Sequence, residues 1–257
     1  MKILKRVLLA LVVLVVLLVG AVASFIVPIF AGSLPIADDA EVGPGVRQVK
    51  DGYVSVFIID GGNGSLGMID CGNDPEGTAI LAALKAKGQT ADQVGSIFLT
   101  HGHPDHTAAC HKFPKAEVYA FPQDVLLAGG QDTAKGFLPH LMGPMPENKR
   151  IKVTKLLQEG QEVSVGTLNV RALATPGHTG GSASYLVNGV LVLGDNATGK
   201  NDGVHLAPKP FSDDPQVNKE SIARLYEHLK AEGSVKTLAF AHSGPIQGID
   251  ALGTPKE

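Results

Sequence analysis

Residues 100–106 read Thr-His-Gly-His-Pro-Asp-His, and this stretch decides how the rest of the chain is interpreted. It directly follows residues 94–100 (VGSIFLT), a short and almost wholly apolar run that predicts a strand buried on both faces. Gly102 and Pro104 exclude a regular helix or strand after it. We therefore expect a loop at the end of a buried strand, where α/β proteins gather their functional groups.

The side chains of this loop predict a metal site. Three histidines and one aspartate fall within six residues, and imidazole with carboxylate is a donor set typical of zinc and similar ions. Packing so many ligands together without a cation would cost desolvation free energy with nothing to offset it. We expect His101 and His103 to converge on one ion and Asp105 and His106 to face another.

Three more candidate ligands follow apolar strands later in the chain. His178 lies in residues 174–182 (ATPGHTGGS), Asp195 in residues 192–196 (VLGDN) and His242 in residues 240–245 (FAHSGP). Each would be a weak signal by itself, because a single His or Asp at a strand end is more often capped or solvated. In this order, after the HxHxDH motif, they resemble the metallo-β-lactamase superfamily over residues 46–250.

The resemblance implies an α/β fold, a four-layer αββα sandwich with a two-metal site along one sheet edge. It implies two Zn²⁺ ions, with iron or manganese as alternatives. His101, His103 and His178 would bind the first ion, Asp105, His106 and His242 the second, and Asp195 would bridge the two. A hydroxide shared by the ions would attack a carbonyl carbon, and Asp105, the candidate catalytic residue, would also hold this nucleophile.

Residues 66–72 (LGMIDCG) resemble the strand of this superfamily that ends in Asp-Thr-Gly. The resemblance implies that Asp70 forms hydrogen bonds to the metal-binding loop. Cys71 stands where the family has threonine. Two cysteines, Cys71 and Cys110, make no disulfide framework, and without a Cα–Cα distance the sequence does not favour a bond between them.

The N-terminus predicts export. Lys2, Lys5 and Arg6 precede an uncharged apolar stretch, residues 7–30, so the charge pattern keeps the N-terminus in the cytoplasm and sends the rest outward. Residues 1–30 are either a signal peptide cleaved after Ala23 or a membrane anchor. The domain is then anchored facing the periplasm or exterior, or is periplasmic or secreted. We expect residues 31–45 to be a linker and residues 46–257 to form the metallo-β-lactamase-like domain.

The remaining pattern predicts two β-rich halves, each covered by helices. Asp74 with Pro75 predicts the start of one helix, and Asp214 with Pro215 the start of a second. Expected strands, besides the one before the histidine loop, are residues 53–59, 66–69, 117–120, 151–157, 161–165, 168–174, 183–187, 190–193 and 235–241. A short helix is expected over residues 122–128.

Two features bear on substrate contact. Residues 128–148 are rich in Gly, Pro and Met, and carry Phe137 and Met142. This segment is expected either to form an apolar wall over the metal site or to pack as core. His205 lies in the loop after Asp195, and such a loop can reach the rim of a cleft.

Composition narrows the function. Apolar residues make up 44% of the 257 residues, charged residues make up 18%, and the net charge is −3, which excludes global disorder and disfavours nucleic acid as a partner.

The expected activity is hydrolysis of a small carboxylic ester, thioester or lactone, because an aspartate at position 195 resembles the glyoxalase II and lactonase branch. Fifteen residues follow His242, so we do not expect the C-terminal substrate domain of glyoxalase II. Alternatives are a β-lactamase, then a phosphodiesterase or nuclease, and an inactive metal-binding scaffold.

Overall fold

The computed structural model describes residues 2–257, and the chain divides into a segment up to Ser33 and a body, Leu34–Glu257. The first segment contains a single helix, α1 (Lys2–Phe30). Its stretch Leu11–Phe30 has a mean hydropathy of 3.0, and none of the residues whose burial is described there is buried. Because about 20 apolar residues suffice to cross a bilayer, α1 is long enough to be either a membrane anchor or a signal sequence.

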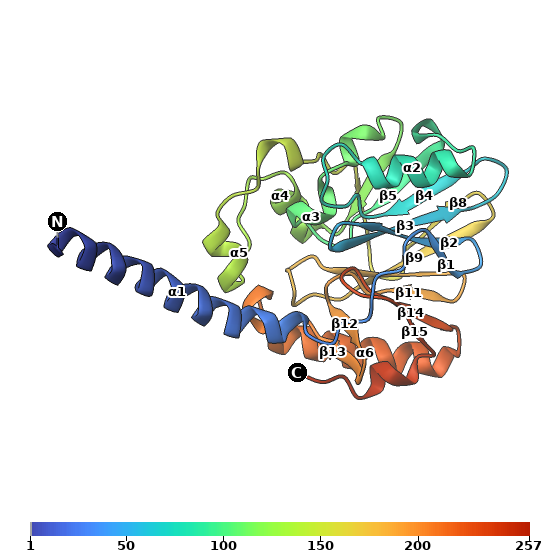
Figure 1. The fold of residues 1–257 in the computed structure, drawn as a ribbon. Helices are drawn as coiled ribbons and strands as arrows, with labels where there is room; N and C mark the ends of the chain where they lie inside the picture. Colours follow the sequence, from blue (N-terminus) through green and yellow to red (C-terminus); the bar gives the residue numbers. More distant parts are fainter. Residues whose placement is uncertain (1) are drawn as a thin grey trace. The chain divides into compact units, whose positions relative to one another are not determined.

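The body is a four-layer αββα sandwich, as the resemblance implies (Figure 1). One sheet follows chain order, β1-β2-β3-β4-β5-β6-β7, and the other has the order β15-β14-β11-β10-β9-β8. The strands of the first sheet are β1 (Ala40–Gly43), β2 (Val46–Asp51), β3 (Val54–Asp60), β4 (Leu66–Ile69), β5 (Val94–Phe98), β6 (Glu117–Ala120) and β7 (Lys155–Leu156). Those of the second are β8 (Glu162–Val165), β9 (Leu168–Ala174), β10 (Ala183–Val187), β11 (Val190–Val192), β14 (Thr237–Ala239) and β15 (Ile246–Gln247).

Helices cover the outer faces of the two sheets, and a small hairpin completes the body. Figure 1 shows α2 over the first sheet and α6 over the second. The hairpin is β12 (Ala197–Lys200) with β13 (Gly203–Leu206). The helices of the body are α2 (Thr78–Ala86), α3 (Pro104–Thr107), α4 (Val125–Ala128), α5 (Phe137–Met142) and α6 (Pro215–Glu232).

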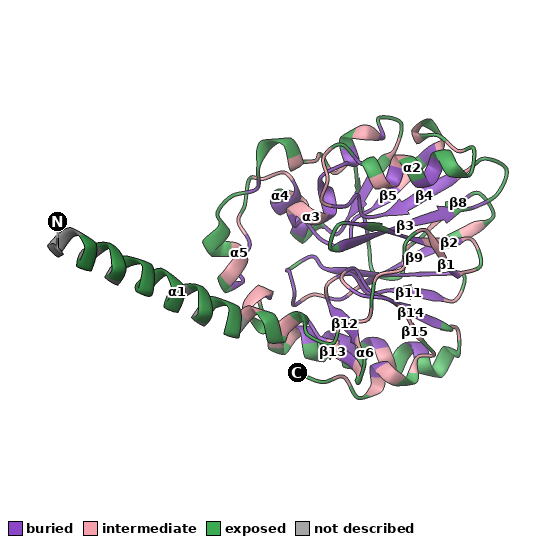
Figure 2. Ribbon diagram, in the orientation of Figure 1, coloured by how far each residue is buried: buried purple, intermediate pink, exposed green. Residues whose placement is uncertain are grey.

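Three apolar clusters separate these layers. Phe57, Phe98 and Tyr185 lie in the cluster between the sheets, which takes side chains from strands of both. A second cluster joins α2 to the first sheet, and a third joins α6 to the second sheet. Figure 2 shows this burial along the strands of both sheets, with exposed residues on the outer sides of the helices. Burial of apolar area on both faces of the strands explains why the central runs are continuously hydrophobic.

Most expected elements form, and the differences have local causes. Strands 66–69, 117–120, 168–174 and 183–187 have the expected bounds. The first helix begins at Thr78 instead of Pro75, because the Asp74 carboxylate accepts the N–H groups of Glu76 and Thr78 and thereby closes a turn before it. Within the expected linker, residues 40–43 form β1, which pairs with β2 and adds an edge strand to the first sheet.

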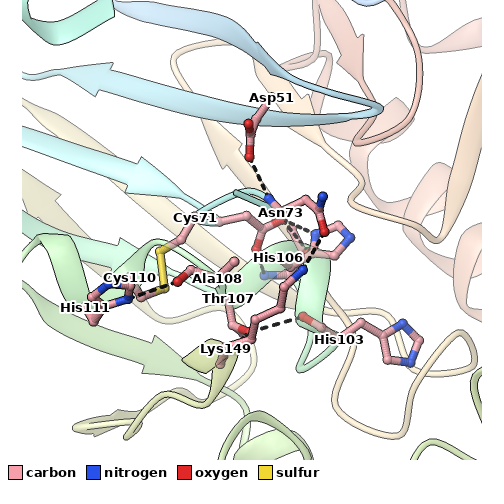
Figure 3. Close-up of a disulfide and its surroundings, with 12 residues drawn as sticks. Asp51, Cys71, Asn73, His103, His106, Thr107, Ala108, Cys110, His111 and Lys149 are labelled. Carbon is pink, nitrogen blue, oxygen red and sulfur yellow. Dashed lines mark hydrogen bonds and ion pairs between the residues drawn. A yellow bond between two sulfur atoms is a disulfide. The ribbon is translucent and has the colours of Figure 1, made fainter. Parts of the chain in front are cut away.

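The structure joins Cys71 and Cys110 in a disulfide, which the sequence did not favour (Figure 3). Cys71 follows β4 and Cys110 begins a 3₁₀ turn, Cys110–Lys112, after α3. Backbone hydrogen bonds bring the two segments together: the N–H of Ala109 donates to the carbonyl of Cys71, and the N–H of Ala108 donates to that of Gly72. The Cα atoms are therefore 5.1 Å apart, within bonding range.

Candidate metal centre

The structure brings all seven predicted ligands to one edge of the two sheets. His101 and His103 follow β5, and Asp105 and His106 lie in α3, the single helical turn that comes next. His178 lies between β9 and β10, Asp195 follows β11, and His242 follows β14. Candidate ligand atoms lie within 4.8 Å of one another in three groups: His101, His103 and His178; His101, His106 and Asp195; and Asp105, His106 and His242.

The first group consists of three buried imidazoles packed edge to face. The ring centroids of His101 and His103 are 4.5 Å apart, and those of His101 and His178 are 4.6 Å apart. Nε2 of His178 lies 3.2 Å from Nδ1 of His103. The second group is more open to solvent, because Asp105 and His242 are partly exposed while His106 is buried.

Asp195 lies between the two groups. Its Oδ2 is 3.5 Å from Nε2 of His178 and 3.1 Å from Nε2 of His242. Its Oδ1 is 3.4 Å from Nε2 of His106. One carboxylate therefore faces histidines of both groups, which is the arrangement that a bridging ligand requires.

Unpartnered polar atoms support a fit between these residues and metal ions. Five buried atoms of the cluster have no hydrogen-bond partner among the described residues: Nε2 of His101, His103 and His106, Nδ1 of His178, and Oδ1 of Asp195. Such groups are costly to bury unless something satisfies them. Imidazole nitrogens and carboxylate oxygens are the donors that Zn²⁺ prefers, so divalent cations suit this cluster.

Burial and charge divide the histidines into two classes. Burial lowers the pKa of His101 and His103, and it lowers that of His178 to about 3, so these rings are neutral and have lone pairs to donate. Burial also disfavours the charged form of His242, but the Asp195 and Asp105 carboxylates outweigh it and raise its pKa to about 9. Asp195 and Asp70 likewise raise the pKa of the buried His106.

Asp70 contacts Thr100 and His106, at the two ends of the histidine loop. Its Oδ2 lies 2.8 Å from Nδ1 of His106, and its Oδ1 accepts the backbone N–H of Thr100 at 2.7 Å. The Thr100 hydroxyl also donates to Asp70 Oδ2 at 2.7 Å. With Nδ1–H directed at Asp70, Nε2 of His106 faces the centre and would bind an ion after losing its proton.

Glycine is required just before Asp195. Gly194 has φ +56°, and a Cβ on it would lie 2.7 Å from Cβ of Thr100. A larger residue would therefore push β11 away from the loop that holds the histidines.

A sequence model described as the metallo-β-lactamase superfamily matches residues 49–232. The chain belongs to the metallo-β-lactamase superfamily. YobT, an uncharacterised protein of Bacillus subtilis strain 168, is 36% identical over 188 residues, which are 65% of this chain and 78% of YobT. A hydroxyacylglutathione hydrolase of Brucella anthropi is 31% identical over 137 residues, 53% of this chain. This match spans only 42% of the length of the Brucella protein.

Solved structures share the superfamily fold. A metallo-β-lactamase from Cronobacter sakazakii, described by its HARLDQ motif, superposes with a TM-score of 0.62 at 21% sequence identity. The superposition covers 82% of this chain and 80% of that one. At this identity the likeness concerns the fold alone.

Asp124 joins the loop of His101 and His103 to the loop of His178, and the sequence pattern did not single it out. Its Oδ2 accepts the N–H of Gly102 and the hydroxyl of Thr179, both at 2.8 Å, and its Oδ1 accepts the N–H of Gly181 at 2.7 Å. Burial raises the pKa of Asp124, and these three hydrogen bonds oppose that shift. An aspartate within the expected helix 122–128 was the one available signal.

Tyr53 is a second residue that the sequence analysis missed. Its ring stacks on that of His242 with 5.8 Å between centroids, and its carbonyl lies 2.8 Å from Nδ1 of the same histidine. Its hydroxyl donates to Oδ1 of Asn73, which also accepts from Nζ of Lys149. Tyr53 therefore contacts His242 directly, and Asn73 connects the Tyr53 hydroxyl to Lys149.

The three residues predicted to contact substrate lie in two different elements. His205 is in β13, where its ring bonds Asp202 at 2.9 Å and its backbone pairs with Lys256. Phe137 and Met142 are in α5 and are 68% and 77% exposed. The segment before α5 is linked to the loop of His178 through Asp213, which accepts the N–H of Gly136 and donates its own N–H to the carbonyl of His178.

Proposed function

We propose that the chain is a zinc-dependent hydrolase of a small carboxylic ester, thioester or lactone. The observation that carries this proposal is the position of the Asp195 carboxylate between the two histidine groups. An aspartate there resembles the glyoxalase II and lactonase branch, whereas the true β-lactamases usually carry Cys or Ser. The relationship to a hydroxyacylglutathione hydrolase supports a thioester among the substrates.

The proposed ligand sets are His101, His103 and His178 for one ion, and Asp105, His106 and His242 for the other, with Asp195 shared between them. Divalent ions bound there would supply a nucleophile from water near neutral pH and a Lewis acid for the carbonyl oxygen. The neutral histidines of the first group provide lone pairs without prior loss of a proton.

We assign Asp105 the task of orienting the attacking water. Its Oδ2 is 3.6 Å from Nε2 of His242, and its carboxylate is partly exposed, so one oxygen can face an incoming substrate. Asp70 and the Tyr53 carbonyl fix the ring orientations of His106 and His242 through their Nδ1 atoms. No serine or cysteine nucleophile is needed.

We further propose that the body is exported, with α1 as the anchor or the signal, and that the apolar side of α5 forms a wall over the substrate. Exposed Phe137, Leu141 and Met142 support the wall, because core side chains would be buried. The link from Gly136 through Asp213 to His178 holds α5 close to the centre. This wall would exclude water from the reacting carbonyl.

The experiment is a substrate panel on the full-length, metal-loaded protein in detergent. A chromogenic ester, an acyl thioester, a lactone and a cephalosporin are compared by kcat/KM, with the His103→Ala variant as the background. Turnover of any of the first three above that background supports the proposal. Turnover of the cephalosporin alone identifies a β-lactamase instead, and no turnover of any member by protein that binds metal identifies a scaffold.

A further inference from the structure

The Cys71–Cys110 disulfide lies directly against the residues that present one side of the metal centre (Figure 3). Cys71 follows Asp70, whose carboxylate bonds the ring of His106. The N–H of Cys71 donates to the carbonyl of His106 at 2.8 Å. The disulfide thus joins the strand end that carries Asp70 to the turn that carries His106.

The segment that carries His106 has little stability of its own. α3 has only four residues, and the side chain of its N-terminal flanking residue, His103, makes no capping hydrogen bond. A single helical turn is unfavourable in isolation, because it fixes several backbone dihedrals for one hydrogen bond. Its position therefore depends on the contacts of residues 106–110 with Cys71 and Gly72, and the disulfide is the covalent member of that set.

The His101, His103 and His178 side of the centre is held by hydrogen bonds to Asp124 and not by the disulfide. Gly102, Thr179 and Gly181 all bond the carboxylate of Asp124, which fixes the loops of His103 and His178. None of these three hydrogen bonds involves residues 70–72 or 106–110. Loss of the disulfide should therefore affect the two sides of the centre unequally.

We propose that the Cys71–Cys110 disulfide is a positioning element for the Asp105–His106–His242 side, so that this side reaches full metal affinity only after the two cysteines are oxidised. This proposal rests on the proposed function, because it takes the centre to bind metal ions. Both sulfurs are buried, so the bond forms before or during folding of this region. The two thiols lose two protons and two electrons to the disulfide of a thiol–disulfide oxidoreductase, which becomes a dithiol. Assembly of the centre is thereby coupled to arrival in an oxidising compartment.

The test measures metal binding and not turnover, so it stands whether or not any ester is hydrolysed. Full-length protein in detergent is titrated with Co²⁺, and the two binding steps are followed by the electronic spectrum and checked by elemental analysis. In the Cys71→Ala/Cys110→Ala variant we expect the first step within about threefold of wild type. We expect the second step to weaken by about 10–100-fold, the range for lost support of a metal ligand.

Two further variants separate positioning from general stability. Leu84→Ala removes a buried side chain from the apolar cluster that also contains Cys71 and Cys110, and it removes none of the hydrogen bonds of residues 70–72 or 106–110. It should lower the melting temperature and leave both Co²⁺ steps unchanged. Cys71→Thr with Cys110→Ala, which restores the threonine of the family, should fold and show the same weakened second step if the double alanine variant does not fold.

The last experiment uses wild-type protein purified under reducing conditions, so that Cys71 and Cys110 stay as thiols. Its second step should be weak and should recover when the reduced protein is unfolded and refolded in the presence of a disulfide reagent. An unchanged second step in both disulfide-free variants would overturn the proposal. An equal weakening in Leu84→Ala, or two free thiols counted in exported protein that binds two ions at full affinity, would overturn it as well.

Discussion

The carboxylate of Asp124 accepts the backbone N–H of Gly102 at 2.8 Å, in the middle of the HGHPDH loop. The same side chain accepts the N–H of Gly181 and the hydroxyl of Thr179, in the loop of His178. One buried carboxylate therefore sets the spacing between two loops that lie about 75 residues apart in the chain. Three donors compensate for burial of its charge.

Asp124→Ala should lower the stability of the protein and also weaken metal binding by the His101, His103 and His178 group. It leaves the backbone N–H groups of Gly102 and Gly181 buried without an acceptor, and each costs about 1–3 kcal/mol. Chemical denaturation of the metal-free protein measures the loss of stability. Asp124→Asn keeps one carbonyl oxygen and should lie between wild type and Asp124→Ala. Equal stability of all three proteins would contradict this role.

The full-length protein should bind two divalent ions, and His103→Ala should lose at least one of them and nearly all turnover. Removal of metal with a chelator should lower the melting temperature, since an ion that binds only the folded state stabilises it by mass action. His228→Ala is the matched control, because His228 lies on α6 and pairs with Glu232. Protein purified with excess divalent metal in which elemental analysis finds no bound ion would contradict the prediction.

A reporter that works only in the cytoplasm, fused after Gly45, should be inactive. Lys2, Lys5 and Arg6 all precede the apolar stretch, so the chain beyond it is expected outside. An active fusion would show the opposite orientation. N-terminal sequencing of the mature protein then distinguishes cleavage after Ala23 from a retained anchor.

Phe137→Ala combined with Met142→Ala should raise KM or lower kcat while leaving the melting temperature almost unchanged. Both side chains are exposed in α5, so their removal opens no cavity. Met145→Ala is the contrasting variant, since Met145 is buried and its Sδ lies 4.0 Å from the hydroxyl of Thr107. That change should cost about 2–5 kcal/mol of stability. A destabilised double variant with unaltered kinetic constants would exclude the wall.

The layered fold and the cluster of seven side chains could be predicted from the sequence. Local pattern predicts that the candidate ligands follow or adjoin apolar runs, and the resemblance to the superfamily implies that His101 lies with His178, Asp195 and His242, which follow strands of the other sheet. Their roles as ligands stay predictions. β2, β12, β13 and β15 were not predicted, because short or largely polar strands carry little hydrophobic periodicity.

The Cys71–Cys110 bond, the place of Asp124 between two loops and the strand within residues 40–43 were decided only by the tertiary structure. Local pattern records how apolar and polar residues alternate along a segment, and this alternation determines which face a strand or helix buries. A disulfide, a shared carboxylate or an edge strand depends on the distance between segments that are far apart in the chain. That distance is set by how the layers pack, which no single segment encodes.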